Sequence, residues 1–455
     1  MIVLSLPYLP NLKLKKSYAK TTTHIEYRLD YHSDPFSLPG KYIGENSILT
    51  LRSVKEGGSY LLSNQQKLNF YADCIKKYNC LVDWELMSYE RSSINPQNLI
   101  ISYHHDQKYK LDFDALIKKL SVIKAKFCKL VLPIDSWEDF SSVYALLKKI
   151  NKPVLFCGTG RYGKLSRVLF PHLGAVGTYI GDDEYKTHPD QLTISEAELY
   201  RLNSISDKTL LGGIIGGKQV YHSLGLDFFN RFFDENHINA RYLPFHLNRF
   251  EQIFEMLSAR PISSKFFGFS VTMPFKQQLA DRFNSEIPLN TYIPKDNLTK
   301  NTDIDGFEKA LAYLHVSDED RILIVGSGAT TISALVACKG LHTFLTARKY
   351  QKAVEIANDH QVEFIEPEKV KNHVFEIVIN CTPIGMQRED FIELTGIRNF
   401  AKFIDLPYTC GDTPIISYCK TNQFPHVDGK LFWQWQARAQ LQCFLSAISD
   451  LQKLR

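Results

Sequence analysis

The sequence has few of the residues that build small cross-linked domains. It contains nine cysteines in 455 residues, an odd number, and no two of them stand in a C-x-x-C pair. This pattern argues against a disulfide framework and against a zinc ribbon. We expect reduced, buried thiols, as is usual in cytoplasmic proteins.

Long apolar runs are also missing. The longest candidate, residues 322–337, contains Gly, Ser and Thr, which favours a strand, a glycine turn and a helix over a membrane span. In the N-terminal segment MIVLSLPYLPNLKLKK the lysines follow the apolar residues and no A-x-A pattern is present, which is not typical of a signal peptide. We expect a cytoplasmic protein with no membrane partner.

The charges show no large excess of one sign. The net charge is +5, and Lys and Arg are interspersed with Asp and Glu. No basic run is long enough to follow a nucleic-acid backbone, so we expect no nucleic-acid partner. Local positive fields can still attract anionic small molecules.

What is present indicates a multidomain α/β protein. The length, with 44% apolar and 23% charged residues, suggests roughly two to four globular domains. Up to about residue 205, apolar runs alternate with amphipathic segments, at 48–51, 99–102, 113–124, 129–132, 138–149 and 154–156. The alternation predicts parallel βα units, and the length lies in the lower range of a (β/α)8 TIM barrel.

The second half is again α/β. A Lys-Thr-Leu-Leu-Gly-Gly stretch at 208–213 precedes a new strand, and we place a domain boundary there. A further division lies near Asp320, where the strand 322–325 runs into a glycine turn. Residues 430–455 form one long helical pattern.

Lys129 is the most informative residue of the first half, because it interrupts an apolar strand. A buried lysine suits Schiff-base formation, and we expect desolvation to lower its pKa. A histidine nearby, His104 or His105, could then move protons near neutral pH. On an earlier strand, alternation places Glu26, Arg28 and Asp30 on one face.

In the second half, the glycine turn after residue 325 offers helix N–H groups for a pyrophosphate. At the end of the next strand, an acidic residue would bind the ribose hydroxyls of NAD. The sequence instead has Arg348 and Lys349 there, and these positive charges favour the 2′-phosphate of NADP. Lys276 and Asp303 could share a proton with a substrate hydroxyl. Each feature alone has an ordinary structural explanation, as a salt bridge, a loop residue or a solvated turn, so the ordered combination carries the interpretation.

Six elements of the first half recur together in one family. They are Glu26-Tyr27-Arg28-Leu29-Asp30, Leu51 to Gly58 (LRSVKEGG), Ser102-Tyr103-His104, Lys129, Gly163 to Arg167 (GKLSR) and Thr187 to Gln191 (THPDQ). In this set the first half resembles the type I 3-dehydroquinate dehydratases, which are TIM barrels.

That resemblance implies roles for these residues. Lys129 would condense with the C3 ketone of 3-dehydroquinate, His104 would take the C2 proton and help water leave from C1, and Glu56 would hold the histidine. Arg167 would clamp the carboxylate. The other implied substrate-binding residues are Glu26, Arg28, Arg52, Thr187 and Gln191. His105 stands where relatives often carry Asp or Asn, so the acid–base role could belong to it instead.

A second set of motifs follows in the other half. They are Gly268 to Lys276 (GFSVTMPFK), Asn290-Thr291, Asn301 to Gly306 (NTDIDG), Ile379 to Met386 (INCTPIGM), Asp405 to Tyr408 (DLPY) and Gln436-Ala437. In these motifs the second half resembles the shikimate dehydrogenases.

By this resemblance Lys276 and Asp303 form the catalytic pair. The implied shikimate-binding residues are Ser223, Thr272, Asn290, Tyr408 and Gln436. The implied NADP-binding residues are Gly326, Ser327, Gly328, Ala329, Thr330, Arg348 and Lys349. Gly225 replaces a serine of the family's substrate-binding turn, Ala329 replaces a glycine, and Ala347 replaces an asparagine.

Both resemblances in this order match the fused dehydratase–dehydrogenases of plants and chlamydia-like bacteria. They imply a barrel at 1–205, a substrate-binding lobe at 210–318 joined by the helix 430–455, and a Rossmann NADP-binding lobe at 319–429. The expected function is dehydration of 3-dehydroquinate to 3-dehydroshikimate, then reduction to shikimate with NADPH, by a monomer or homodimer without a metal. Two alternatives stay open: a dehydrogenase half that is weakened or prefers quinate, and a non-catalytic metabolite sensor.

Overall fold

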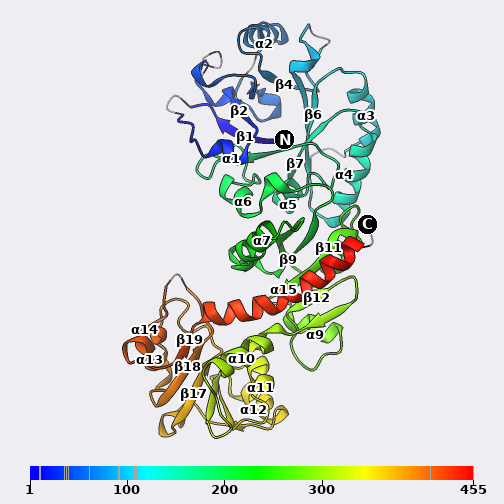
Figure 1. Cartoon of the computed structure of the whole chain (residues 1–455). Coiled ribbons are helices and arrows are strands. Elements are labelled where there is room, and N and C mark those ends of the chain that lie inside the picture. The colour runs from blue at the N-terminus through cyan, green and yellow to red at the C-terminus, as the bar shows by residue number, and fades with distance from the viewer. Residues whose placement is uncertain are drawn as a thin grey trace. The chain divides into compact units, whose positions relative to one another are not determined.

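The structure, a computed structural model, describes residues 1–9, 12–34, 36, 38, 40–60, 62–90, 93–105, 111–409 and 411–453. Cys410 and the last two residues of the predicted C-terminal helix lie outside these ranges. The chain divides into two compact units (Figure 1), one of Met1–Leu211, Leu226–Leu243 and Glu251–Phe266, the other of Gly212–Gly225, Pro244–Phe250 and Phe267–Arg455. The three-domain division expected from the sequence stays a prediction.

Eight parallel strands form the N-terminal sheet, in the order β7-β6-β5-β4-β3-β2-β1-β8. They are β1 (Ile2–Pro7), β2 (His24–Arg28), β3 (Ser47–Thr50), β4 (Leu81–Glu85), β5 (Leu99–His104), β6 (Phe127–Pro133), β7 (Val154–Thr159) and β8 (Thr178–Gly181). The edges meet where the Phe156 amide donates to the Gly177 carbonyl at 2.9 Å. The predicted barrel is confirmed, and the predicted strands at 48–51, 99–102, 129–132 and 154–156 each start within two residues of an observed strand start.

Helices follow most of these strands. They are α1 (Tyr18–Thr21), α2 (Asn64–Tyr78), α3 (Phe113–Ser121), α4 (Trp137–Lys149), α5 (Gly163–Val168) and α6 (Ile194–Leu199), with the 3₁₀ turns η1 (Leu29–Tyr31), η2 (Gly40–Tyr42), η3 (Val54–Glu56), η4 (Pro96–Asn98) and η5 (Leu202–Ser204). Ser63, Ser136 and Thr193 begin helices as N-caps, each accepting from the amide three residues on.

One detail of the predicted strand pattern is wrong. Strand β2 ends at Arg28, and Asp30 lies in the turn η1. The turn lets the Asp30 carboxylate reach back to the Arg28 guanidinium, at 2.8 Å from Nε and 2.6 Å from Nη2. This buried ion pair helps to stabilise the turn.

A five-stranded sheet has the order β10-β9-β11-β12-β13. Its strands are β9 (Leu210–Gly216), β10 (Ala240–His246), β11 (Phe266–Val271), β12 (Thr291–Ile293) and β13 (Leu298–Lys300). Along this part of the chain lie the helices α7 (Gly225–Glu235), α8 (Gln252–Ser258), α9 (Lys276–Arg282) and α10 (Thr302–Tyr313), and the turns η6 (Lys218–His222) and η7 (Ser263–Lys265). Strand β12 runs antiparallel to both β11 and β13.

A six-stranded parallel sheet has the order β16-β15-β14-β17-β18-β19. Its strands are β14 (Ile322–Val325), β15 (Thr343–Thr346), β16 (Glu363–Phe364), β17 (Phe375–Asn380), β18 (Phe400–Asp405) and β19 (His426–Val427). Its helices are α11 (Ala329–Ala337), α12 (Tyr350–Asp359), α13 (Phe391–Thr395), α14 (Pro414–Thr421) and α15 (Gly429–Lys453), with the turn η8 (Val370–Asn372). Both the strand 322–325 and the long terminal helix are as predicted.

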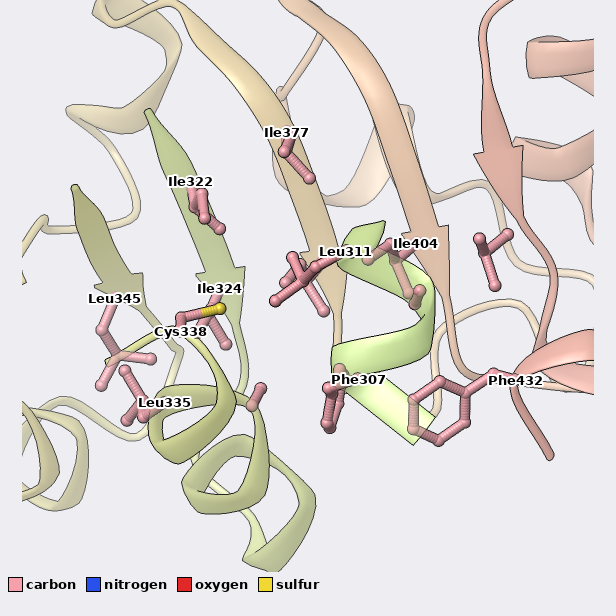
Figure 2. Close-up of a cluster of buried hydrophobic side chains, with 14 of the residues drawn as sticks. Phe307, Leu311, Ile322, Ile324, Leu335, Cys338, Leu345, Ile377, Ile404 and Phe432 are labelled. Carbon is pink, nitrogen blue, oxygen red and sulfur yellow. The ribbon is translucent and has the colours of Figure 1, made fainter. Parts of the chain in front are cut away.

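The two faces of this sheet carry separate cores. Alternation along β14 sends Ile322 and Ile324 to one face and Leu323 to the other. On the first face, Phe307 of α10, Leu335 of α11 and neighbours pack over the strands (Figure 2). Within the described residues, no helix is both long and apolar enough to span a membrane.

Phe307 is fully buried in this cluster, so we expect Phe307→Ala to leave a cavity. The free energy of unfolding should fall by about 3–5 kcal/mol. Urea unfolding followed by circular dichroism measures the change. Glu308→Ala, exposed on the same helix, should change it by less than about 0.5 kcal/mol; equal effects of the two variants would contradict this packing.

Candidate active sites

The barrel interior holds a layer of six polar side chains, each from a different strand. They are Ser5 (β1), Glu26 (β2), Thr50 (β3), Asp83 (β4), Ser102 (β5) and Lys129 (β6), all at most 4% exposed. Parallel register brings them together, because Lys129 pairs with Ser102 and Thr50 with Asp83 across neighbouring strands. Buried polar groups of this kind must satisfy one another.

Lys129 lies at the centre of this layer. Its Nζ is 2.9 Å from Glu26 Oε1 and 3.0 Å from Asp83 Oδ2. The ammonium also lies 4.1 Å from the centroid of the Tyr179 ring, which is a favourable cation–π distance. The described contacts of this side chain are therefore all with groups that stabilise its charged form.

We expected the pKa of Lys129 to be lowered, and this expectation is wrong: the net shift of the pKa is upward. Burial does oppose the charge, but the carboxylates of Asp83 and Glu26 outweigh it and raise the pKa. The sequence showed the apolar strand around the lysine but not which carboxylates the other strands would bring to it. The amine must therefore lose its proton before it can act as a nucleophile.

Glu26 is held as a carboxylate. Its burial alone would raise the pKa, yet Lys129 and Arg28 lower it to about 2. One oxygen accepts from Thr50 at 2.8 Å and the other from Ser5. A carboxylate so bound is a fixed negative charge at any physiological pH.

His104 and Glu56 form a dyad at the mouth of the barrel. His104 Nδ1 is 3.0 Å from Glu56 Oε2, and Arg52 Nη2 donates to Nε2 of the same ring. Because an arginine can only donate, Nε2 accepts and Nδ1 carries the proton. His105 instead contacts Tyr103, with its Nδ1 3.3 Å from the phenol oxygen, so the geometry favours His104 as the acid–base residue.

The charges around the dyad keep the imidazole neutral. Burial, then Arg52 and Lys129, lower the pKa of His104 well below its usual value. Burial and then Glu85 raise the pKa of Glu56 to about 8. A neutral imidazole can accept a proton, but Arg52 must first release Nε2.

A cavity of about 790 Å³ opens beside the dyad, with Arg52, Glu56, Tyr103, His104 and His105 in its wall. Its size suits a small polar ligand. Lys129 is not among the residues that line this cavity.

The other predicted residues of this half lie around the same mouth. Arg167 is 3% exposed and donates to the carbonyls of Gly158 (3.2 Å) and Tyr179 (2.7 Å). Gln191 accepts from the Thr187 amide at 3.0 Å, and the Thr187 hydroxyl lies 2.8 Å from Ser5. Arg28 is paired with Asp30, as described above.

Sequence reasoning missed four residues of this site: Ser5, Asp83, Ser102 and Tyr179. Asp83 is the most important, because it holds Lys129 and also accepts from Ser102 at 2.5 Å. Its signal was present, since an acidic residue inside the apolar stretch LVDWEL has the same need of a partner as Lys129.

The second site centres on Lys276 and Asp303, which the structure brings together. Lys276 begins α9 and its Nζ is 2.6 Å from Asp303 Oδ2 near the start of α10. The Asn290 amide donates to the other Asp303 oxygen at 2.9 Å. The lysine side chain is 17% exposed and that of the aspartate 11%, so the pair is accessible to a ligand.

A buried network fixes Asn290. Its Oδ1 accepts from the Thr302 amide at 2.9 Å and from the Thr291 hydroxyl at 2.9 Å. Gln436 accepts from the Thr302 hydroxyl at 3.2 Å, and Gln440 donates to the Asn290 carbonyl at 3.1 Å. Sequence reasoning named Asn290 and Gln436 but missed Thr302 and Gln440; Gln440 lies one turn after Gln436 on α15.

A cavity of about 770 Å³ adjoins this pair. Thr272 and Lys276 lie in its wall, followed by the glycine turn Gly326–Thr330 and by Arg348 and Lys349. Gly326 has φ +139°, and a Cβ there would meet Thr331 Oγ1 at 3.0 Å and Cys381 at 3.2 Å, so the turn needs glycine. The glycine turn offers backbone groups for a pyrophosphate, and Arg348 and Lys349 offer positive charge for a further phosphate. These features fit a phosphorylated dinucleotide.

Two other predicted substrate-binding residues, Ser223 and Tyr408, are not among the residues that line this cavity. Ser223 accepts from the Gly225 amide at 3.2 Å, at the start of α7. Tyr408 is 39% exposed after β18, and burial of its hydroxyl raises the pKa. Among the residues that the structure describes, no cluster of three His, Cys, Asp or Glu side chains could hold a metal ion.

Two family models match the chain. Residues 11–207 match type I 3-dehydroquinase. Residues 215–286 match the shikimate dehydrogenase substrate binding domain. The order of the two matches is the order in which the two sites occur.

Curated relatives cover one or both halves. A bifunctional 3-dehydroquinate dehydratase/shikimate dehydrogenase, chloroplastic, from Arabidopsis thaliana is 23% identical over 95% of this chain and 79% of its own length. A shikimate dehydrogenase (NADP(+)) from Pelagibacter ubique is 27% identical over 50% of this chain and 89% of its own. A solved dehydroquinate dehydratase and shikimate dehydrogenase from S. pombe is 19% identical, with 99% and 98% of the two chains covered and a TM-score of 0.42.

Replacing Asp83 by Asn should lower the pKa of Lys129, because one of the two carboxylates that oppose desolvation is lost. We expect a fall of roughly one to three units. The pH dependence of labelling by fluorodinitrobenzene, read at the Lys129 peptide by mass spectrometry, measures it. Asp182→Asn is the control, since that buried carboxylate contacts Tyr18 and Lys15; an unchanged Lys129 midpoint in Asp83→Asn would contradict the pairing.

Proposed function

Because the chain matches the models of type I 3-dehydroquinase and of the shikimate dehydrogenase substrate binding domain in this order, we propose that it dehydrates 3-dehydroquinate at Lys129 and reduces 3-dehydroshikimate to shikimate with NADPH at Lys276 and Asp303. The observation that supports the first step most is the buried ammonium between Glu26 and Asp83. The Lys276–Asp303 contact of 2.6 Å supports the second.

In the proposed dehydration, Lys129 first transfers its proton to a neighbouring carboxylate. Asp83 and Glu26 both lie within reach of the ammonium, at 3.0 and 2.9 Å. The free amine then attacks the C3 ketone, and loss of water gives a protonated imine. The imine acidifies the hydrogen at C2.

His104 supplies the acid–base chemistry of this proposal. Its neutral ring takes the C2 proton through Nε2 once Arg52 turns to the substrate, and returns it to the hydroxyl that leaves C1 as water. Glu56 orients the ring through Nδ1. Hydrolysis of the imine then releases 3-dehydroshikimate and restores Lys129.

Substrate binding is assigned to the polar side chains around the barrel mouth. Arg167 would hold the carboxylate, and Glu26, Arg28, Arg52, Thr187 and Gln191 would hold the hydroxyl and carbonyl groups. Arg28 and Arg52 are already paired, with Asp30 and His104, so in this proposal they change partners when the substrate enters.

In the proposed reduction, Lys276 and Asp303 exchange the proton of the hydroxyl that forms. Asn290 fixes the aspartate, which leaves the lysine free to turn toward the carbonyl oxygen. Ser223, Thr272, Tyr408 and Gln436 are the other proposed contacts of shikimate. A bound NADPH supplies the hydride.

The cofactor would lie along the second cavity. Gly326, Ser327, Gly328, Ala329 and Thr330 would hold its pyrophosphate, since they lie at the N-terminus of the helix that starts at Ala329. Arg348 and Lys349 would hold the 2′-phosphate. Cytoplasmic location and the monomer or homodimer state stay predictions, and no observation favours the quinate-preferring or sensor alternatives.

Lys129→Ala and Lys276→Ala should separate the two activities. Lys129→Ala should lose dehydration of 3-dehydroquinate to the enzyme-free rate and keep the reductase, because only the first site needs an amine nucleophile; Lys276→Ala should do the reverse. Steady-state assays of both reactions measure this. Borohydride with 3-dehydroquinate should leave an adduct on the Lys129 peptide, and full dehydratase activity in Lys129→Ala would end the proposal.

Arg348→Ala should weaken NADP binding selectively. Loss of a hydrogen bond to a charged group is worth about 1.5–3 kcal/mol, so KM for NADP should rise by roughly 10- to 150-fold, while KM for NAD stays the same. Rates with shikimate and with quinate, each with either cofactor, give the numbers. Lys371→Ala, an exposed lysine of η8, is the control; an equal rise for both cofactors would rule out a 2′-phosphate contact.

A further inference from the structure

A second buried ion pair lies beside the barrel site. Lys67 of α2 contacts Glu85 at the end of β4, and the two residues are 6% and 3% exposed. Neither residue has a role in the reactions proposed above. Burying two charges is costly unless their remaining donors and acceptors are satisfied, so their other partners indicate what the pair does.

Those partners are backbone groups on either side of Arg52. Lys67 Nζ donates to the Leu51 carbonyl at 2.9 Å, and the Ser53 amide donates to Glu85 Oε1 at 2.7 Å. The second carboxylate oxygen accepts from Lys67. The ion pair therefore bridges the two peptide groups that set the direction of the Arg52 side chain.

Two more contacts complete this frame. The Leu51 amide donates to the Tyr71 hydroxyl, which in turn donates to the Asp83 carbonyl, both at 2.9 Å. The Gly58 amide donates to the Ser53 carbonyl at 2.8 Å, and a Cβ on Gly58 would lie 1.9 Å from the Arg52 carbonyl oxygen. The segment 51–58 is thus fixed at both ends.

This segment carries both side chains that contact His104, namely Arg52 and Glu56. We infer that Glu85, paired with Lys67, is a positioning residue of the dehydratase site. It holds the segment 51–58 against His104 and keeps a negative charge beside Glu56. The inference rests on the proposed dehydration.

The charge of Glu85 has a direct effect on Glu56. Burial and then Glu85 raise the pKa of Glu56 to about 8, Asp83 adds to the effect, and Arg52 and Lys67 oppose it. The other charged or titratable groups in the cavity wall are His104, Lys55, Tyr60, Tyr89, Glu90, Tyr103, His105, Asp112 and Lys119. Removing the Glu85 charge favours ionised Glu56 and so lowers its pKa.

The test is the pH profile of kcat/KM for dehydration by the full-length chain. Glu56→Gln identifies the limb that belongs to Glu56, because that limb disappears. Glu85→Gln keeps an oxygen that can accept from the Ser53 amide but removes the charge. We expect the limb to move to lower pH by roughly one unit, and Glu85→Asp, with its charge one methylene farther away, to give an intermediate limb.

Asp182→Asn is the matched control, a buried carboxylate of the same barrel that should cost stability without moving the limb. If Glu85→Gln lowers the rate equally at every pH, the residue is structural only and the inference is overturned. If Glu85→Gln does not fold, the limb of Glu85→Asp decides, and an unshifted limb overturns the inference. A complete lack of dehydration by the unsubstituted chain would instead overturn the proposed function.

Discussion

One ammonium ion between two carboxylates organises the barrel. Lys129, Glu26 and Asp83 are buried together, and the free-energy penalty of burying them is large unless each is paired and hydrogen-bonded. Ser5 and Ser102 donate to the two carboxylate oxygens that do not contact Lys129, and Thr50 donates to the Glu26 oxygen that does. Six strands contribute to this layer, so their register must be correct for any of these charges to be tolerated inside the barrel.

The sequence predicted most of the fold because its pattern is local. The strands at 99–102, 129–132 and 322–325 and the C-terminal helix could be read from periodicity and glycine turns. It did not predict the pairing of residues distant in the chain. Asp83 reaches Lys129 across 46 residues, and that contact reverses the expected direction of the lysine pKa. The turn at Asp30 escaped for a different reason, since alternation shows which residues could share a face of a strand but not where the strand ends.

The candidate sites follow the same division. His104 and Glu56, and likewise Lys276, Asp303 and Asn290, were named from motifs and lie in contact with one another. Lys129 was named in the same way, and its contact within the predicted set is Glu26. Gln440 and the pair Lys67–Glu85 belong to no such motif. They act on backbone groups, so their importance depends on which carbonyl or amide lies opposite them, and only the fold determines that.

Each half of the chain pairs a lysine with a carboxylate, and the two lysines differ in how deeply they are buried. The Lys129 side chain is 5% exposed and meets two carboxylates, whereas that of Lys276 is 17% exposed and meets one. A lysine shut inside a barrel cannot pass its proton directly to solvent, so a neighbouring carboxylate must take it before a covalent imine can form. A lysine at the edge of an open cavity can exchange its proton with a ligand and with water, and reduction of a ketone needs one such proton besides the hydride. In the proposed function, the different tasks of the two lysines therefore depend on how deeply each is buried and on how many carboxylates it meets.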